Sequence, residues 1–371
     1  MNRFDFSRAA SPSAALARWG TRQPDDNMGD RSAPRFLAGG TNLIDLWREG
    51  VMQPTHLVDV SRLPFTGIER DADGTIHLGA LATNAVTAQH ELVREHLPVL
   101  RSAILAGASP QIRNRATNGG NLMQRARCLY FYDVAVPCNK RQPGSGCPAS
   151  TGLARQHAIL GASPMCVATH PSDMCVALAA LDARIHVIGE GGPRVLPFED
   201  LHRLPGDRPD LDTTLLPGEL ITRIEIPSNR FQSHSSYLKV RERASYAFAL
   251  VSVAAALEIG ADGRVTTARV ALGGVAHKPW RNRHAEAALV GQPLVRESYE
   301  HCAALVLAEA QWCGAALPGS PPGNRFKIPL AHRAIVRALE MAASGVPTNT
   351  GEDGCSPDEH TLDSGSAGDR R

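Results

Sequence analysis

The residues best suited to chemistry are cysteines gathered in one irregular segment. Four of the chain's eight cysteines follow the spacing C-x9-C-x8-C-x18-C, namely Cys128, Cys138, Cys147 and Cys166. Prolines and glycines interrupt the stretch RCLYFYDVAVPCNKRQPGSGC, which predicts a loop and not a helix or strand. Four thiolates suit either a tetrahedral zinc ion or a [4Fe–4S] cluster. Because the tight C-x2-C pairs of structural zinc sites are missing, the wide spacing favours the cluster but leaves zinc open.

Cys175 competes with Cys166 for the fourth position. Cys175 lies in DMCVALAALDA, an apolar helical run in which a cysteine usually serves as a small core residue. Cys166 stands at the exit of the loop, before the strand-like VAT, so we predict Cys166 as the fourth member of the set. Disulfides are the alternative in an oxidising compartment. Eight cysteines in 371 residues are nevertheless too few for a disulfide scaffold.

Three turns are suited to an anionic, sugar-bearing ligand: AGGTN (38–42), TNGGN (117–121) and HPSD (170–173). Paired glycines let the backbone approach a ligand and aim consecutive N–H groups at an anion. Two such turns brought together would hold a pyrophosphate, while HPSD offers a hydroxyl and a carboxylate to a ribose. Each glycine pair alone is equally compatible with an ordinary turn. The sequence has neither a G-x-G-x-x-G fingerprint after its first strand nor a P-loop, so neither of those nucleotide sites is indicated.

Strand-like and helix-like segments alternate around these turns. Residues 34–50 read as strand, glycine turn and helix, with Thr41 or Asn42 suited to cap the helix. Residues 85–109 show helical periodicity that ends at Gly107. Further along, 236–275 reads as long strands around one helix, and two helices follow in ESYEHCAALVLAEAQWC and IPLAHRAIVRALEMAAS.

The pattern predicts two domains and a tail. We expect a first domain over 1–228 with the cysteine insert at 125–166, a second domain over 232–342, and a disordered tail over 343–371. A hydrophobic content of 43% and a charged content of 20% are ordinary for a globular protein. The net charge of +2 gives no reason to expect nucleic acid as a partner. Charges interrupt the apolar runs too often for membrane insertion, and the first residues resemble neither a Sec signal nor a twin-arginine signal.

Several motifs agree at once with a known family. FLAGGTNLIDLWREG, GASPQIRNRATNGGNLMQ, ATHPSDMCVALAALDA and YLKVRERASYAFALVSVAAAL resemble, in this order, the FAD-binding subunits of the xanthine dehydrogenase and carbon monoxide dehydrogenase family of molybdenum hydroxylases. The resemblance implies an α+β chain. Its first part would be a two-part α/β FAD-binding domain of the PCMH-like type, followed by a smaller α+β domain of the carbon monoxide dehydrogenase flavoprotein type.

The resemblance also implies which residues contact FAD. The first turn would wrap the pyrophosphate through the backbone amides of Leu37, Ala38, Gly39, Gly40, Thr41 and Asn42, with Ile44 just beyond. The second turn would comprise Asn118, Gly119, Gly120 and Asn121, flanked by Ser109 and Thr117. Hydroxyl groups of the ribityl or ribose would meet Ser172 and Asp173, with His170 beside them. The segment that approaches the flavin ring would carry Lys239 and Tyr246, for which a surface or packing role is the alternative.

The insert is similar to that of the FAD subunits of heterotrimeric periplasmic aldehyde oxidoreductases, which implies a [4Fe–4S] cluster on the four loop cysteines. The implied function is electron transfer from a [2Fe–2S] subunit, through the FAD held here, to an external acceptor. Aldehyde oxidation would take place on a separate molybdenum cofactor subunit, so we name no catalytic residue. Such a heterotrimer would reach the periplasm on a partner's export signal, and would stay in the cytoplasm if that partner lacks a twin-arginine signal.

Two other functions stay open at this point. The cluster could brace the loop without carrying electrons, which is compatible with FAD binding. The chain could instead be a stand-alone FAD oxidoreductase, which would need its own substrate pocket. An aromatic content of 5% and the lack of an evident acid–base pair count against that second function.

Overall fold

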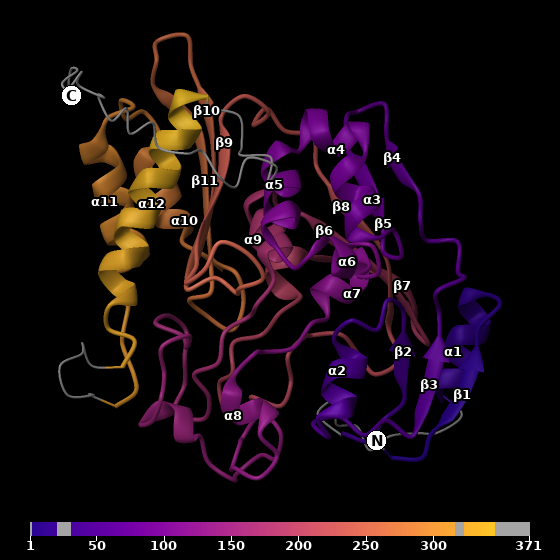
Figure 1. Cartoon of the computed structure of the whole chain (residues 1–371). Coiled ribbons are helices and arrows are strands. Elements are labelled where there is room, and N and C mark those ends of the chain that lie inside the picture. Colours follow the sequence, from indigo (N-terminus) through magenta and orange to yellow (C-terminus); the bar gives the residue numbers. More distant parts are fainter. Residues whose placement is uncertain (1, 21–30, 316–322, 346–371) are drawn as a thin grey trace, which may run out of the picture.

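The computed structural model describes residues 2–20, 31–315 and 323–345. Within these ranges the strands form three sheets. Figure 1 shows the chain passing from a small first sheet, through a helix-covered second sheet, to a third sheet with helices on its outer face. The mixture of helices and sheets confirms the predicted α+β class. In the described part of the chain, no helix has the length and apolar character needed to span a bilayer.

A small parallel sheet carries the first glycine turn. Its strands, in spatial order, are β1 (Asp5–Arg8), β3 (His56–Asp59) and β2 (Arg35–Leu37). Leu37 pairs with Asp59 at the end of β2, so the chain leaves the sheet directly into the turn. Beyond the turn α2 (Leu43–Arg48) begins, while α1 (Pro12–Gly20) contacts β3. The order of strand, turn and helix predicted for 34–50 is confirmed.

A larger antiparallel sheet forms the body of the first domain. Its strands, in spatial order, are β4 (Ile68–Arg70), β5 (Ile76–Gly79), β8 (Leu220–Ile226), β6 (Arg184–Gly189) and β7 (Gly192–Pro197). The helices of this domain are α3 (Asn84–Gln89), α4 (Glu91–His96), α5 (Pro98–Ala106), α6 (Pro110–Arg113), α7 (Asn118–Leu122), α9 (Asp173–Ala180) and the 3-10 helix η2 (Phe198–Asp200).

The helical run predicted over 85–109 is divided into three helices. His90 is extended and separates α3 from α4, and Pro98 starts α5 because a proline cannot continue the preceding helix. The end of α5 at Gly107 is confirmed.

The third sheet and its helices form the second domain. The strands, in spatial order, are β12 (Trp280–Arg281), β11 (Val265–Gly273), β10 (Val251–Ile259) and β9 (Ser235–Val240). The helices are α10 (Arg283–Leu289), α11 (Arg296–Val306) and α12 (Lys327–Ser344). They cover one face of the sheet, where α12 lies across β9 and β10 (Figure 1). Both helices predicted in this region are present, but the first, α11, ends at Val306 and does not reach Cys313 as predicted.

The helix predicted within 236–275 is wrong, because the alanine-rich run is strand β10. This strand is buried on both faces. Val251, Val253 and Leu257 pack into the core beneath α12, while Ala254 and Ala256 pack into the core that contains α9. A strand covered on both sides loses the polar–apolar alternation that would identify it, and its alanines then resemble a helix.

Helices α5 and α9 lie between the second and third sheets. Both contact the third sheet, and every residue of α9 is buried. Small side chains on the facing strands, including Ala254 and Ala271, belong to the same core and allow this close approach. The arrangement fixes the start of α9, which carries the HPSD turn, against the second domain.

The cysteine loop connects α7 to α9 and lies at one edge of the molecule, around the label α8 in Figure 1. It contains the short helices α8 (Leu129–Tyr132) and η1 (Pro148–Ser150). The prediction of a stretch without a helix over 127–147 is therefore wrong at α8, while η1 follows that stretch. At the other end of the chain, α12 includes the first residues of the predicted tail. The rest of that tail, from 346 onward, lies outside the described residues.

Candidate functional site

The two glycine turns line one cavity in the first domain. Its volume is about 260 Å3. The first turn, 38–42, forms one wall, and Thr117, Gly119 and Gly120 at the start of α7 form another. The segment from Leu122 to Arg125 closes the cavity. Turns that are far apart in the sequence are therefore brought together.

The first turn presents unpaired backbone amides to this cavity. A Cβ atom added to Gly39 would lie 2.2 Å from the carbonyl oxygen of Arg115, and Gly40 has a φ of 76°, so both positions favour glycine. Within the described ranges, no group accepts a hydrogen bond from the N–H of Gly39, Gly40 or Thr41. Consecutive free N–H groups of this kind suit the oxygens of a phosphate.

Asn42 occupies the N-cap of α2, as predicted, but its side chain makes no capping bond. Its Oδ1 accepts a hydrogen bond from the backbone N–H of Arg125 at 2.9 Å instead. The predicted capping role of Asn42 is therefore wrong, because its side chain bonds the start of the cysteine loop and not the helix.

The second turn is closed by its own hydrogen bonds. The hydroxyl of Thr117 accepts from the N–H of Gly120 at 3.2 Å, and the N–H of Gly119 donates to the carbonyl of Ala80 at 2.7 Å. A Cβ on Gly119 would lie 3.1 Å from the Cβ of Ala80, which is a tight contact. We expected unpaired N–H groups at both turns. In the second turn the N–H groups of Gly119 and Gly120 are already bonded, so this turn contributes closely packed backbone to the cavity and not these two donors.

A second cavity, of about 320 Å3, lies between the two domains. His170, Ser172 and Asp173 of the HPSD turn line it from the first domain. Phe248 and Gly274 line it from the second. The hydroxyl of Ser172 caps α9, accepting the N–H of Cys175 at 3.1 Å, and donates to Oδ1 of Asn121 at 2.7 Å. These bonds hold the turn at the cavity.

The carboxylate of Asp173 joins the two domains. It accepts hydrogen bonds from the hydroxyl of Tyr237 at 2.6 Å and from Nζ of Lys239 at 2.7 Å, both on β9. The lysine and the carboxylate are almost fully buried. Burial, followed by the charge of Asp173, raises the pKa of Tyr237 well above its ordinary value. The side chain of Lys239 is thus committed to a buried ion pair that the sequence did not reveal.

Several residues expected at FAD do not line either cavity: Ile44, Ser109, Asn118, Asn121, Lys239 and Tyr246. Ser109 caps α6, and Asn118 is buried in bonds to Thr87 and the carbonyl of Gly79. Tyr246 is 57% exposed, whereas Phe248, two residues further on, lines the second cavity. The segment was predicted from the sequence, but which of its side chains faces inward was not.

The four loop cysteines line a third, small cavity together: Cys128, Cys138, Cys147 and Cys166. Cys147 and Cys166 interact directly, and the thiol of Cys166 holds the pKa of Cys147 down to about 6. Burial raises the pKa of Cys128 to about 11. Cys128 also lines the second cavity, so the two spaces share this residue.

Side-chain bonds to the backbone hold the cysteine loop in shape. Arg141 donates to the carbonyls of Tyr130 and Phe131 at 3.0 and 2.8 Å. Asn139 accepts from the N–H of Gly146 at 2.7 Å and donates to the carbonyl of Met165 at 2.9 Å. These bonds bring distant parts of the loop together around the thiols.

Asp212 balances the positive charge beside the loop. It pairs with Arg125 at 2.6 Å and with the buried ammonium group of Lys140. Burial alone would raise the pKa of Asp212, but the charges of Arg125 and Lys140 outweigh that effect and hold it well below its usual range. Residues that are distant in sequence meet in this cluster, and no motif in the sequence indicates it.

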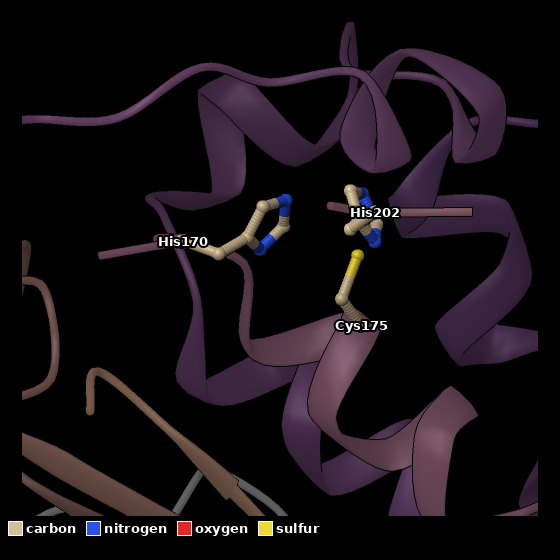
Figure 2. Close-up of side chains that lie close together, drawn as sticks. All are labelled: His170, Cys175 and His202. Carbon is tan, nitrogen blue, oxygen red and sulfur yellow. The ribbon is translucent and has the colours of Figure 1, made fainter. Parts of the chain in front are cut away.

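Cys175 lies apart from the loop thiols, in the core between the sheets. Figure 2 shows its sulfur near the rings of His170 and His202, and the ligand-type atoms of the three lie within 4.8 Å of one another. Burial raises the pKa of Cys175 to about 12, which keeps the thiol protonated. The Nδ1 atom of His170 accepts from the N–H of Ser172 at 3.4 Å, which leaves the ring proton on Nε2, toward the other two side chains. The trio is therefore described best as a packed buried group.

The comparison with known families decides what these sites belong to. Residues 4–229 match the family of FAD binding domains in molybdopterin dehydrogenases, and 236–342 match the carbon monoxide dehydrogenase flavoprotein C-terminal domain. The chain belongs to the FAD-binding subunits of the molybdenum hydroxylase family. Membership makes it a subunit of an oxidoreductase, with FAD as the cofactor of its first domain.

Individual relatives of this FAD-binding subunit agree with the assignment. The aldehyde oxidoreductase FAD-binding subunit PaoB of Escherichia coli K12 is 49% identical over 290 residues, which cover 78% of this chain and 86% of the relative. The carbon monoxide dehydrogenase medium chain of Afipia carboxidovorans is 26% identical over 343 residues, 91% and 98% of the two chains. Both relatives are single chains of multi-subunit enzymes.

A solved structure shows the same fold. The chain aligns with a carbon monoxide dehydrogenase chain from Oligotropha carboxidovorans with a TM-score of 0.69 and 24% identity, over 92% of this chain and 98% of that one. The residues present in the two cavities fit FAD, because unpaired amides suit its phosphates and the HPSD turn offers polar groups beside an apolar, inter-domain space.

Proposed function

We propose that the chain is the FAD- and [4Fe–4S]-binding electron-transfer subunit of a molybdenum-dependent aldehyde oxidoreductase. The observation that carries the proposal is the 49% identity to an aldehyde oxidoreductase FAD-binding subunit, over 86% of that relative. We further propose a [2Fe–2S] subunit and a molybdenum cofactor subunit as partners in a heterotrimer. Such a complex would be periplasmic if a partner carries an export signal, and cytoplasmic if it does not.

FAD, when bound, stores two electrons and allows one-electron donors to be matched to a two-electron acceptor. The chain's own residues would hold it across both cavities. The first turn would bind the phosphates through the amides of Gly39, Gly40 and Thr41. The ring would occupy the inter-domain cavity, beside the HPSD turn and Phe248, because both domains contribute to that wall. Ser172 would offer its hydroxyl to the sugar alcohol chain.

Support for the cluster comes from the arrangement of the four loop thiols around one cavity, with Cys175 excluded from it. Four thiolates are the ligand set of a [4Fe–4S] cluster. Arg141 donates to the loop's backbone at the carbonyl of Phe131, while Lys140 bonds Asp212 and the carbonyl of Pro209. The thiol of Cys147 and burial raise the pKa of Cys166, and the charge of Lys140 opposes that rise, which favours a thiolate there.

Flavin and metal contents test the proposal separately. The chain expressed with its partners should show the visible spectrum of a bound flavin, and a product without flavin would refute the FAD assignment. Iron and acid-labile sulfide should approach about four of each per chain. They should be lost in Cys138→Ser and retained in Cys175→Ser, which is the matched control. Retention in Cys138→Ser, or zinc in the place of iron, would refute the cluster.

A further inference from the structure

His157, in the later part of the cysteine insert, also lines the inter-domain cavity. Its Nε2 lies 3.1 Å from Sγ of Cys128, and its ring is beside that of Tyr130, with centroids 6.3 Å apart. The residue is 4% exposed, yet it lines the second cavity. Cys128 lines that cavity as well as the cavity of the four thiols. Of the pair, Cys128 is the residue that the two spaces share, and His157 contacts it from the side of the second cavity.

The second domain fixes the backbone of His157. Its carbonyl accepts from Nδ2 of Asn324 at 3.0 Å and from Nζ of Lys327 at 2.8 Å. Lys327 also donates to the carbonyl of Gly274 at 2.5 Å, and Gly274 lines the opposite wall of the second cavity. Lys327 is fully buried, and its two hydrogen bonds link the two walls of the cavity. The position of the imidazole is determined by the fold and not by the loop alone.

The chemistry of the contact sets its direction. A thiolate that binds iron carries no proton, so Sγ of Cys128 can only accept a hydrogen bond. The ring proton must then be on Nε2, which donates to Sγ. In the described part of the chain, Nδ1 has no hydrogen-bond partner that would fix the opposite tautomer.

We propose that His157 is a positioning residue that donates a hydrogen bond from Nε2 to Sγ of Cys128 and thereby raises the reduction potential of the [4Fe–4S] cluster beside the flavin cavity. The inference rests on the proposed function. Reduction adds negative charge to the cluster, and a hydrogen bond to a ligand sulfur stabilises the more negative state. The contact also couples the cluster to the cavity wall that both domains build.

Redox titration of the assembled complex, followed by the EPR signal of the reduced cluster, tests this role. His157→Leu removes the donor, whereas His157→Gln can keep an N–H at the position of Nε2. Tyr130→Phe is the matched control, because it removes a polar side-chain contact of the loop, the bond from the N–H of Leu153, and leaves the contact between His157 and Sγ in place. We expect His157→Leu to shift the reduction equilibrium by about tenfold toward the oxidised cluster, which is ~59 mV for one electron. His157→Gln and Tyr130→Phe should stay close to the wild type.

Iron analysis separates the possible failures. A wild-type complex without iron would refute the proposed cluster, before any variant is compared. An iron-loaded His157→Leu with the wild-type potential would refute only the role of His157. If His157→Leu loses its cluster, pulsed EPR of the wild-type complex labelled with 15N-histidine decides the question. A resolved coupling from one histidine nitrogen to the reduced cluster supports the hydrogen bond, and the absence of coupling overturns it.

Discussion

Replacing Gly39 with alanine should release FAD from the first turn. The new Cβ would lie 2.2 Å from the carbonyl oxygen of Arg115, where an ordinary contact needs 3.4 Å or more, so the backbone must move by about 1 Å. The neighbouring atoms in contact are all backbone, which leaves no flexible side chain to give way. A shift of about 1 Å takes a hydrogen bond of ~2.9 Å beyond its useful range. Losing one amide bond to a charged phosphate costs ~1.5–3 kcal/mol, or ~10–100-fold in the dissociation constant.

Quenching of FAD fluorescence on titration with the apo chain measures this constant directly. Gly191→Ala is the matched control, because its Cβ would meet nothing within 4 Å and its φ is not in the left-handed region. Thermal unfolding without FAD separates misfolding from weak binding. A Gly39→Ala chain that folds and binds FAD as tightly as the wild type would refute the assignment of the first turn to the phosphates.

Two further predictions concern buried charge. Burial lowers the pKa of His202 from 6.5 to about 4, so below pH ~6.5 the unfolded chain takes up a proton that the folded chain refuses until about pH 4, and stability falls. His202→Gln keeps a donor for the carbonyl of Leu122 but cannot titrate. Between pH 7 and pH 5, its loss of unfolding free energy, measured in urea, should therefore be ~2 kcal/mol smaller than that of the wild type. Equal losses in the two proteins would contradict the buried neutral ring. Among the residues that the structure describes, Lys239→Met leaves Tyr237 as the one side-chain partner of the buried Asp173 carboxylate, and should cost ~3–5 kcal/mol in the same assay. The double variant with Asp173→Asn should restore most of that loss. A single variant as stable as the wild type would show that the pair does not join the domains.

The sequence was sufficient where local chemistry decides the structure. Paired glycines predicted the turn at 38–42, and Gly107 predicted the end of α5. Gly40 has a φ of 76°, a conformation that few residues other than glycine adopt, so the residue type carries the information there. Gly107 is extended, with a φ of −94°, and marks the end of the helix through the low helix propensity of glycine. The convergence of the two glycine turns could not be derived from periodicity, and came instead from the resemblance to a family.

Prediction failed where tertiary contacts override local preference. β10 has the composition of a helix, and only its burial between α12 and α9 makes it a strand. Asn42 has the side chain of a helix cap, but the N–H of Arg125 competes for it successfully. A place for Lys239 at the flavin stays a prediction, but its buried pairing with Asp173 from the other domain was not foreseen. In each case the partner is distant in sequence, and no local pattern encodes the choice.

The cysteine loop is built into the flavin-binding domain and is not an independent attachment. Arg125, at its first residues, donates its N–H to Asn42 of the first turn, lines the first cavity and pairs with Asp212. Just beyond its other end, Ser172 of the HPSD turn donates to Asn121 of the second turn, and within the insert His157 and Cys128 line the inter-domain cavity. Both ends of the insert are therefore fixed by residues that also shape the cavities. Because the same side chains serve both, we expect a change in the loop to alter FAD binding through these contacts, and linkage requires FAD to act on the loop in the same measure.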